Sequence, residues 1–265
     1  MPTIEASHED LCGLIGKKLG IEELKDAILY AKGEIDSADG DLLKIDIKDT
    51  NRPDLWSAEG IAREIKGRYS VGGCPKYKIK ESNVVVNVDK KNSSVRPYTV
   101  CAVAKNLKIT ADVLSQIIQL QEKIHTTFGR NRKEVAMGIY DLERIKPPIR
   151  FTTVKPEGIK FVPLDFEEKL TPKEILEKHP KGREFGHLLA GCREYPIFMD
   201  SDNEVLSIPP IINSNYSGKI TEKNKKRFHR MQRIQPQVLN TGAERGGGSV
   251  VGQESRSAKR KNRLS

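Results

Sequence analysis

Charge is divided so unevenly along the chain that it separates a part able to fold from a part that is not expected to. Residues 1–218 carry 33 Lys and Arg against 33 Asp and Glu, whereas residues 219–265 carry 13 against 3 and hold the whole net charge of +10. The second segment contains one aromatic side chain, Phe228, and few large aliphatics. Because it buries too little apolar surface to offset the entropy of ordering, we expect a neutral folded body and a largely disordered basic tail.

The body carries no signature of a membrane segment, an export signal or a metal site. No apolar run approaches the ~18 residues that span a bilayer, and the N-terminus MPTIEASHEDLCGLIG lacks the basic region of a signal peptide. No Cys or His spacing matches a zinc site. We therefore expect no metal, a soluble cytoplasmic protein and reduced thiols at Cys12, Cys74, Cys101 and Cys192.

Hydrophobic periodicity predicts an α+β fold in two parts. Residues 1–76 predict a small α+β domain that ends in the Gly- and Pro-containing stretch at 67–77. Residues 77–218 predict a mixed-sheet domain with packed helices, and residues 219–265 form the tail. Buried strands are expected at VVVNV, YTVCAVA and EVAMGIYD, a hairpin at YPIFMD and EVLSI, and a helix from Thr110 whose apolar stripe reaches Phe128.

The stretch DTNRPDLWSAEGIAREIKG (49–67) concentrates special residues ahead of a helix. Pro53 restricts its own φ and favours extended geometry at Arg52. Ser57 can cap the helix that follows, and Glu59 favours the positive end of its dipole. We predict a rigid strand-to-helix corner, held by an Arg52–carboxylate pair and by packing of Trp56, rather than a catalytic loop.

Two further stretches hold candidate functional residues. Arg130, Arg132 and Lys133 follow the 110–128 helix, where they either complement its negative end or contact the phosphates of a nucleic acid. The loop EVLSIPPIINSNYSG (204–218) is stiffened by two prolines and suits a pocket wall. It contains no GxSxG elbow, so hydrogen bonding is expected of Ser207 rather than nucleophilic attack. The glycines of AERGGG do not form a phosphate-binding loop.

Several long segments together resemble the N-terminal half of the β subunit of phenylalanyl-tRNA synthetase, of the archaeal and eukaryotic type. The resemblance covers residues 1 to about 222. Its segments are IKDTNRPDLWSAEGIAREIKG, LSQIIQLQEKIHTTFGRNRKEVAMGIYD, RIKPPI, LEKHPKGREFGHLL and VLSIPPIINSNYSGKIT.

The resemblance implies a ligase subunit of protein biosynthesis. The family's synthetase is an (αβ)₂ heterotetramer that attaches phenylalanine to tRNA(Phe) with ATP and Mg²⁺, and its α subunit carries the aminoacylation site. A module matching residues 77–218 is implied to be the editing domain, which hydrolyses tyrosine wrongly attached to tRNA(Phe). This chain alone would supply at most that esterase activity, and no cofactor is expected to bind it.

The same resemblance implies roles for individual residues. Asn213 and Ser207 fall on catalytic pocket positions, where Asn213 would orient a water against the ester carbonyl and no covalent nucleophile is needed. The implied substrate-binding residues are Gln121, Phe198 and Ser214. The implied RNA-binding residues are Arg130, Arg132 and Lys133.

The tail departs from the family pattern. After GKIT the family continues into an apolar strand with an acidic pocket residue, whereas this chain continues as EKNKKRFHRMQ, with a basic stretch around Arg230. One hypothesis is a frame-disrupted or truncated ending. Two alternatives to an editing enzyme therefore stay open: a non-catalytic RNA-binding module that uses its basic tail, and a scaffold that only docks a partner subunit.

Overall fold

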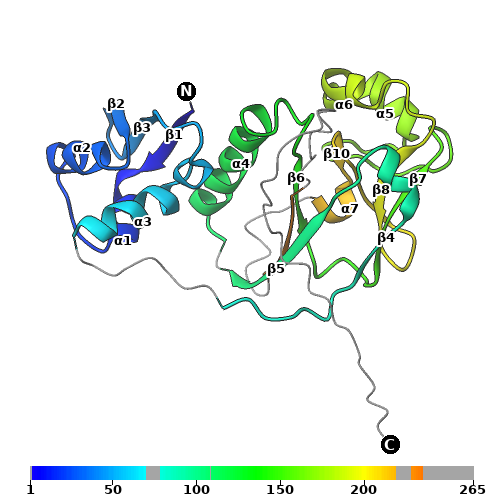
Figure 1. Ribbon diagram of the computed structural model, residues 1–265, viewed down its shortest axis with the longest axis horizontal. Helices are drawn as coiled ribbons and strands as arrows, with labels where there is room; N and C mark the ends of the chain where they lie inside the picture. The colour runs from blue at the N-terminus through cyan, green and yellow to red at the C-terminus, as the bar shows by residue number, and fades with distance from the viewer. Residues whose placement is uncertain (1, 70–77, 108, 219–227, 235–265) are drawn as a thin grey trace, which may run out of the picture.

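The computed structural model describes residues 2–69, 78–107, 109–218 and 228–234. An N-terminal α+β unit is joined to a larger unit with two sheets, and a long helix, α4 (Ala111–Thr126), lies between them (Figure 1). The predicted α+β class is confirmed. Among the described residues, no helix is long and apolar enough to cross a membrane.

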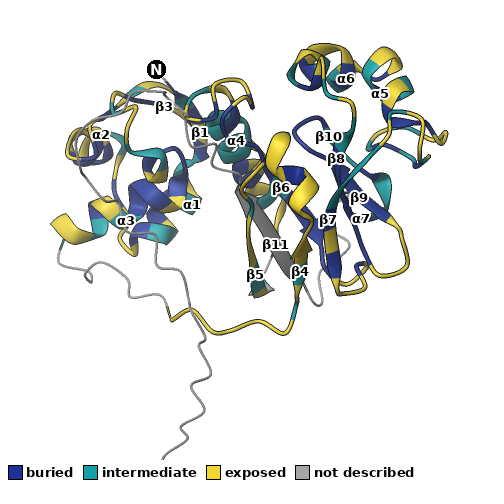
Figure 2. Cartoon of the chain, turned by 45° about the vertical axis from the view of Figure 1, so that its right-hand side comes forward, coloured by how far each residue is buried: buried dark blue, intermediate teal, exposed yellow. Residues whose placement is uncertain are grey.

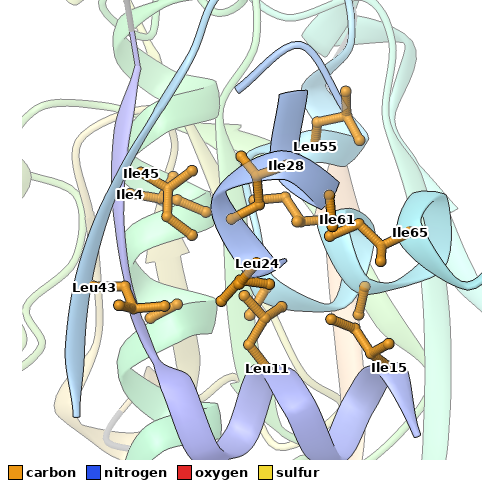
Figure 3. Packing of buried hydrophobic residues seen from close by; sticks show 14 of the residues in the cluster. Ile4, Leu11, Ile15, Leu24, Ile28, Leu43, Ile45, Leu55, Ile61 and Ile65 are labelled. Atoms are coloured by element: carbon orange, nitrogen blue, oxygen red, sulfur yellow. The ribbon is translucent and has the colours of Figure 1, made fainter. Parts of the chain in front are cut away.

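The N-terminal unit is an antiparallel three-stranded sheet covered by three helices. The strand order is β1 (Thr3–Ser7), β3 (Leu42–Ile47) and β2 (Gly33–Asp39). Alternate residues of the strands point to one face, where their aliphatic side chains pack on the helices (Figure 3). The helices are α1 (His8–Ile15), α2 (Ile21–Leu29) and α3 (Ala58–Arg68).

The predicted corner at residues 49–67 is confirmed. A short 3₁₀ turn, η1 (Pro53–Leu55), precedes α3, and Ser57 Oγ accepts a hydrogen bond from the Gly60 amide. The Arg52 guanidinium binds both oxygens of the Asp54 carboxylate at 2.9 Å and reaches Glu64 at 3.0 Å. Trp56 is fully buried in the core. These residues therefore hold the entry to α3.

Gly60 gives this corner a sharp mutational test. A Cβ at position 60 would lie 1.6 Å from the Asp54 carbonyl oxygen, whereas a Cβ at Gly67 on the same helix meets nothing within 4 Å. We expect Gly60→Ala to lower the free energy of unfolding by about 2–3 kcal/mol, because backbone must move. Gly67→Ala should be neutral or stabilising by up to ~1 kcal/mol. Urea unfolding followed by Trp56 fluorescence measures both, and equal effects would contradict the close approach.

The larger unit is built on a five-stranded mixed sheet. Its strand order is β10, β9, β8, β7, β4, and only the β4–β7 pair is parallel. The predicted hairpin is confirmed as β8 and β9. The strands are β4 (Val86–Val88), β7 (Ile149–Val154), β8 (Tyr195–Met199), β9 (Val205–Ile208) and β10 (Ile212–Asn213).

Short helices surround this sheet. Thr171 caps α5 (Pro172–Lys178) in a capping box with Glu174. The other helical segments are η2 (Lys90–Ser94), α6 (Pro180–Phe185), η3 (Gly186–Leu189) and α7 (Asn215–Gly218).

The second sheet of this unit recruits a strand from the basic tail. Strand β11 (Phe228–Ile234) lies between β5 (Val100–Leu107) and β6 (Met137–Asp141) and pairs antiparallel with both. The prediction of disorder was wrong for these seven residues, because two neighbouring strands supply backbone hydrogen bonds that composition does not reveal. The rest of the predicted disordered tail lies outside the described residues.

Three predictions of burial were wrong. Val85 and Val88, in the expected buried strand at VVVNV, are 52% and 48% exposed, and β4 is the edge strand of its sheet. Val100 and Cys101, at the start of an expected buried strand, are exposed, because β5 is an edge strand (Figure 2). Phe128, the expected end of an apolar stripe, is 60% exposed, because α4 ends at Thr126 and the chain then turns. Among the other cysteines, Cys12 is buried, Cys192 is half-buried and Cys74 lies outside the described residues.

Candidate functional site

A cavity of about 530 Å³ lies between α4, β6 and the loop that joins β9 to β10. Aliphatic side chains form much of its wall, and polar groups project from each of these elements. The apolar lining includes Leu114, Ile117, Ile118, Met137, Ile139, Ile208 and Ile211. The polar lining is Gln121, Glu122, His125, Arg132, Tyr140, Asp165, His179, Lys181, Ser207 and Asn213.

Ser207 and Asn213 face each other across the β9–β10 pair. The register pairs these two residues directly, so their side chains lie on the same face. The Ser207 hydroxyl is buried and shares a hydrogen bond of 2.7 Å with the Tyr140 hydroxyl. The half-buried Asn213 amide donates to the Ile139 carbonyl at 3.4 Å, a long contact that leaves hydrogen-bonding capacity for a ligand.

Arg132 also lines the cavity and binds the loop that joins β9 to β10. Its guanidinium donates to the carbonyls of Pro210 and Ile211, at 3.2 and 2.9 Å, and to the Glu122 carboxylate at 3.1 Å. It also lies 4.1 Å from the centre of the Phe185 ring. One buried cation thus ties α4, the β9–β10 loop and α6 together.

The backbone around Arg132 is unusual. Arg130, Asn131 and Arg132 have φ values of 46°, 53° and 66°, so three successive residues are left-handed. Each costs about 1 kcal/mol in a non-glycine residue. Flanking backbone hydrogen bonds, from Arg132 N to His125 O and from Glu134 N to Gly129 O, hold the turn. The contacts of Arg132 offset this strain, because they hold the turn against the cavity wall.

Glu122 and His125, both on α4, lie next to the Arg132 side chain. His125 is buried and accepts a hydrogen bond at Nε2 from the Met137 amide at 2.8 Å. Its Nδ1 lies 3.6 Å from Glu122. The His125 ring, followed by the Arg132 guanidinium, holds the pKa of the Glu122 carboxyl down at about 2. The carboxylate therefore stays ionised at neutral pH.

This carboxylate gives the cavity a predictable response to acid. A Glu with a lowered pKa stabilises the fold above its ordinary pKa of 4.5, and that contribution is lost as the pH falls through about 2. The difference in unfolding free energy between wild type and Glu122→Gln should therefore shrink across this window. Because the side chain is 43% exposed, solvent screening keeps the effect small. Urea titrations over this pH range measure it, and a constant difference would contradict the pairing.

Comparison with known proteins decides the family. No family model matches the chain. The phenylalanine–tRNA ligase β subunit of Pyrococcus abyssi is 52% identical over 235 residues, covering 86% of this chain and 42% of that protein. The β subunit of Methanosarcina barkeri is 41% identical over 223 residues, covering 84% and 40%. The chain therefore spans about two-fifths of the length of these curated relatives.

A solved structure agrees with these relatives. The crystal structure of an N-terminal fragment of the phenylalanyl-tRNA synthetase β subunit from Pyrococcus horikoshii matches with a TM-score of 0.85 at 48% identity. The match covers 90% of this chain and 69% of that fragment. The chain belongs to the phenylalanyl-tRNA synthetase β-subunit family.

Within this β-subunit fold, three of the five expected catalytic and substrate-binding residues line one cavity and two do not. Ser207, Asn213 and Gln121 are in the lining. Phe198 is fully buried and stacks on Phe151, with ring centres 4.2 Å apart, so it supports Ser207 from the neighbouring strand rather than touching a ligand. Ser214 is buried and lines a separate hollow.

The three expected RNA-binding residues differ in their exposure to solvent. Arg130 and Lys133 are exposed, so both are able to meet a phosphate. Arg132 is only 7% exposed and its guanidinium is engaged inside the protein. The structure thus gives Arg132 contacts within the protein, and its role at the RNA stays a prediction. Burial also lowers its pKa, the cost of desolvating a cation.

Six polar lining residues were not among the expected site residues, namely Glu122, His125, Tyr140, Asp165, His179 and Lys181. Glu122 follows Gln121 directly, so the helical neighbourhood was a signal that pointed to it. Tyr140 sits in an apolar strand, and its pairing with Ser207 depends on how β6 packs against β9. The described residues include no group of three metal-ligating side chains.

Proposed function

We propose that the cavity hydrolyses the ester of tyrosine wrongly attached to tRNA(Phe). One observation carries the proposal: the Ser207 and Tyr140 hydroxyls and the Asn213 amide project into one cavity with apolar walls. Tyrosine differs from phenylalanine by one hydroxyl. A site that hydrogen-bonds this hydroxyl discriminates strongly against phenylalanine, which lacks it. A pocket built for phenylalanine discriminates only weakly against tyrosine, which adds one hydroxyl.

Roles for the residues follow from their contacts. Ser207 and Tyr140 supply hydroxyl groups for the phenol of the substrate, and Asn213 recognises the substrate and orients a water against the ester carbonyl. Gln121 contributes a further polar contact from α4. Ser207 acts in recognition rather than as a nucleophile, because its hydrogen-bond partner is a tyrosine, which is a poor general base at neutral pH.

The proposal extends to the assembly that the relatives' names imply. The word subunit in those names supports an α-subunit partner, in an (αβ)₂ synthetase that charges tRNA(Phe) with ATP and Mg²⁺. Neither ATP nor Mg²⁺ is assigned to this chain. The boundaries of the N-terminal domain at 1–76 and the editing domain at 77–218 stay predictions, with α4 in contact with both.

Deacylation of the two esters tests the proposal. We expect the chain to hydrolyse Tyr-tRNA(Phe) at least ~100-fold faster than Phe-tRNA(Phe), since only the first satisfies the buried polar groups. Release of labelled amino acid from the tRNA measures both rates. Equal rates for the two esters would sink the editing proposal.

The basic tail provides the alternative outcome of the same experiment. If the chain binds tRNA without hydrolysis, and deletion of residues 219–265 abolishes both binding and its salt dependence, the chain is a non-catalytic RNA-binding module. If an α subunit co-purifies with the chain but neither tRNA binding nor turnover occurs, it is a docking scaffold. The charge of +10 confined to this segment is the feature that favours the first of these.

A further inference from the structure

Helix α4 is shared between the two units of the chain. Leu120 and Ile124 pack against the N-terminal core. Gln121, Glu122 and His125, which lie on another side of the same helix, line the cavity. Figure 1 shows α4 between the N-terminal sheet and the sheets of the larger unit. Any movement of α4 relative to the N-terminal unit is therefore transmitted to the cavity wall.

Gln119 docks α4 on the edge of the N-terminal sheet. β1 is an edge strand, so alternate backbone groups face away from β3. The Gln119 Nε2 donates to the Glu5 carbonyl at 3.0 Å, and its Oε1 accepts from the Glu5 amide at 2.6 Å. The side-chain amide thus takes the place of a neighbouring strand's peptide group. The two hydrogen bonds fix both the position and the orientation of α4 against β1.

A second contact lies one helical turn earlier. The Gln116 Nε2 donates to the Asp10 carboxylate at 2.8 Å, and Gln116 is only 5% exposed. Asp10 belongs to the first turn of α1, where its amide is capped by Ser7. Gln116 and Gln119 of α4 therefore both attach to elements at the start of the chain.

On its cavity side, α4 is tied to β6 through a single ring. His125 Nε2 accepts from the Met137 amide at 2.8 Å, which joins the helix to the strand that carries Tyr140. The Met137 amide is therefore a reporter of the cavity wall, just as the Glu5 amide is a reporter of the docking contact.

We infer that Gln119 is a positioning residue for the cavity: its paired hydrogen bonds to Glu5 hold α4, and with it the wall formed by Gln121, Glu122 and His125. This rests on the proposed function for its catalytic consequence. A displaced wall misplaces the ester relative to Asn213, and a shift of about 1 Å costs up to ~100-fold in rate.

Amide exchange and hydrolysis by the same variants test the inference. In Gln119→Leu, the Glu5 and Met137 amides should exchange about fivefold faster, and kcat for Tyr-tRNA(Phe) should fall about tenfold with a smaller change in KM. Glu5→Gln is a matched control because the contact uses the Glu5 backbone. Ser115→Ala is a second control, since Ser115 is exposed on α4. Both controls should resemble wild type in all three measurements.

The outcomes separate the inference from the proposed function. If Glu5 exchange rises while Met137 exchange and kcat stay at wild-type values, docking does not position the cavity and the inference fails. It also fails if neither amide responds. If both amides respond but the unmodified chain does not hydrolyse Tyr-tRNA(Phe), α4 is positioned as inferred and the proposed function is the part that fails.

Discussion

Replacing Arg132 with methionine is expected to lower the free energy of unfolding of the larger unit by about 3–5 kcal/mol, the usual cost of removing one partner from a buried ionic network. The change keeps a long apolar side chain near Phe185 but removes every donor. The Pro210 and Ile211 carbonyls then lose this partner inside the protein, and Glu122 loses its cation while keeping His125 beside it. Their desolvation is no longer compensated, which makes the loss larger than the value of the bonds themselves.

The matched control for this variant is Arg130→Met. Arg130 lies two residues away in the same left-handed turn, but its side chain is 64% exposed and its ion pair with Glu134 is 4.0 Å long. We expect a change within about 0.5 kcal/mol, as for most exposed positions. Urea unfolding followed by amide exchange in β9 measures both variants, because Trp56 reports only on the N-terminal unit.

Arg132→Lys refines this test. Lysine keeps the charge but lacks the planar guanidinium that reaches two carbonyls and a carboxylate. The stability of the Arg132→Lys variant should therefore lie between those of wild type and Arg132→Met. If Arg132→Met instead weakens tRNA binding with unchanged stability, the earlier expectation of an RNA contact is right and the structural role is wrong.

Asn213→Ala is expected to lower kcat/KM for hydrolysis of Tyr-tRNA(Phe) about 100-fold, the effect of losing one well-placed polar group at a reacting carbonyl. Stability should change by less than about 1 kcal/mol, because the only side-chain bond that Asn213 makes among the described contacts is the 3.4 Å donation to Ile139. Activity and stability therefore separate in this variant. Unchanged hydrolysis would remove Asn213 from the site.

Asn215→Ala is the control at a neighbouring asparagine. Its side chain donates to the Phe166 carbonyl at 3.3 Å, and Asn215 lines the separate hollow that also contains Ser214 rather than the cavity. The substitution removes a similar hydrogen bond, at a position two residues from Asn213. We therefore expect the rate of hydrolysis to change less than about threefold, with a loss of stability comparable to that of Asn213→Ala. Equal effects of the two variants on hydrolysis would indicate a general loosening of the loop instead of a specific role.

Local rules anticipated much of the fold. Ser57 and Thr110 each cap the helix that was expected to follow them. The corner at 49–67 closes on Arg52 and Trp56 as expected. These features depend on residues a few positions apart, so composition and spacing carry the necessary information.

Contacts between distant segments were not anticipated. The Arg132 side chain is buried because it binds the carbonyl of Pro210, which lies 78 residues further along the chain. Phe198 pairs with Ser207 in the register but is fully buried, where it stacks on Phe151. β11 forms because β5 and β6 leave room for a strand between them. None of these outcomes has a local signal.

For this protein, the sequence alone determined the family resemblance, the helix caps, the corner at residues 49–67 and the loop that carries Ser207 and Asn213. All of these are encoded in short, contiguous patterns. Only the tertiary structure decided that Arg132 is buried, that Tyr140 joins Ser207 and that Gln119 reaches Glu5. The physical reason is that hydrogen-bond partners and desolvation are set by the packing of segments far apart in the chain.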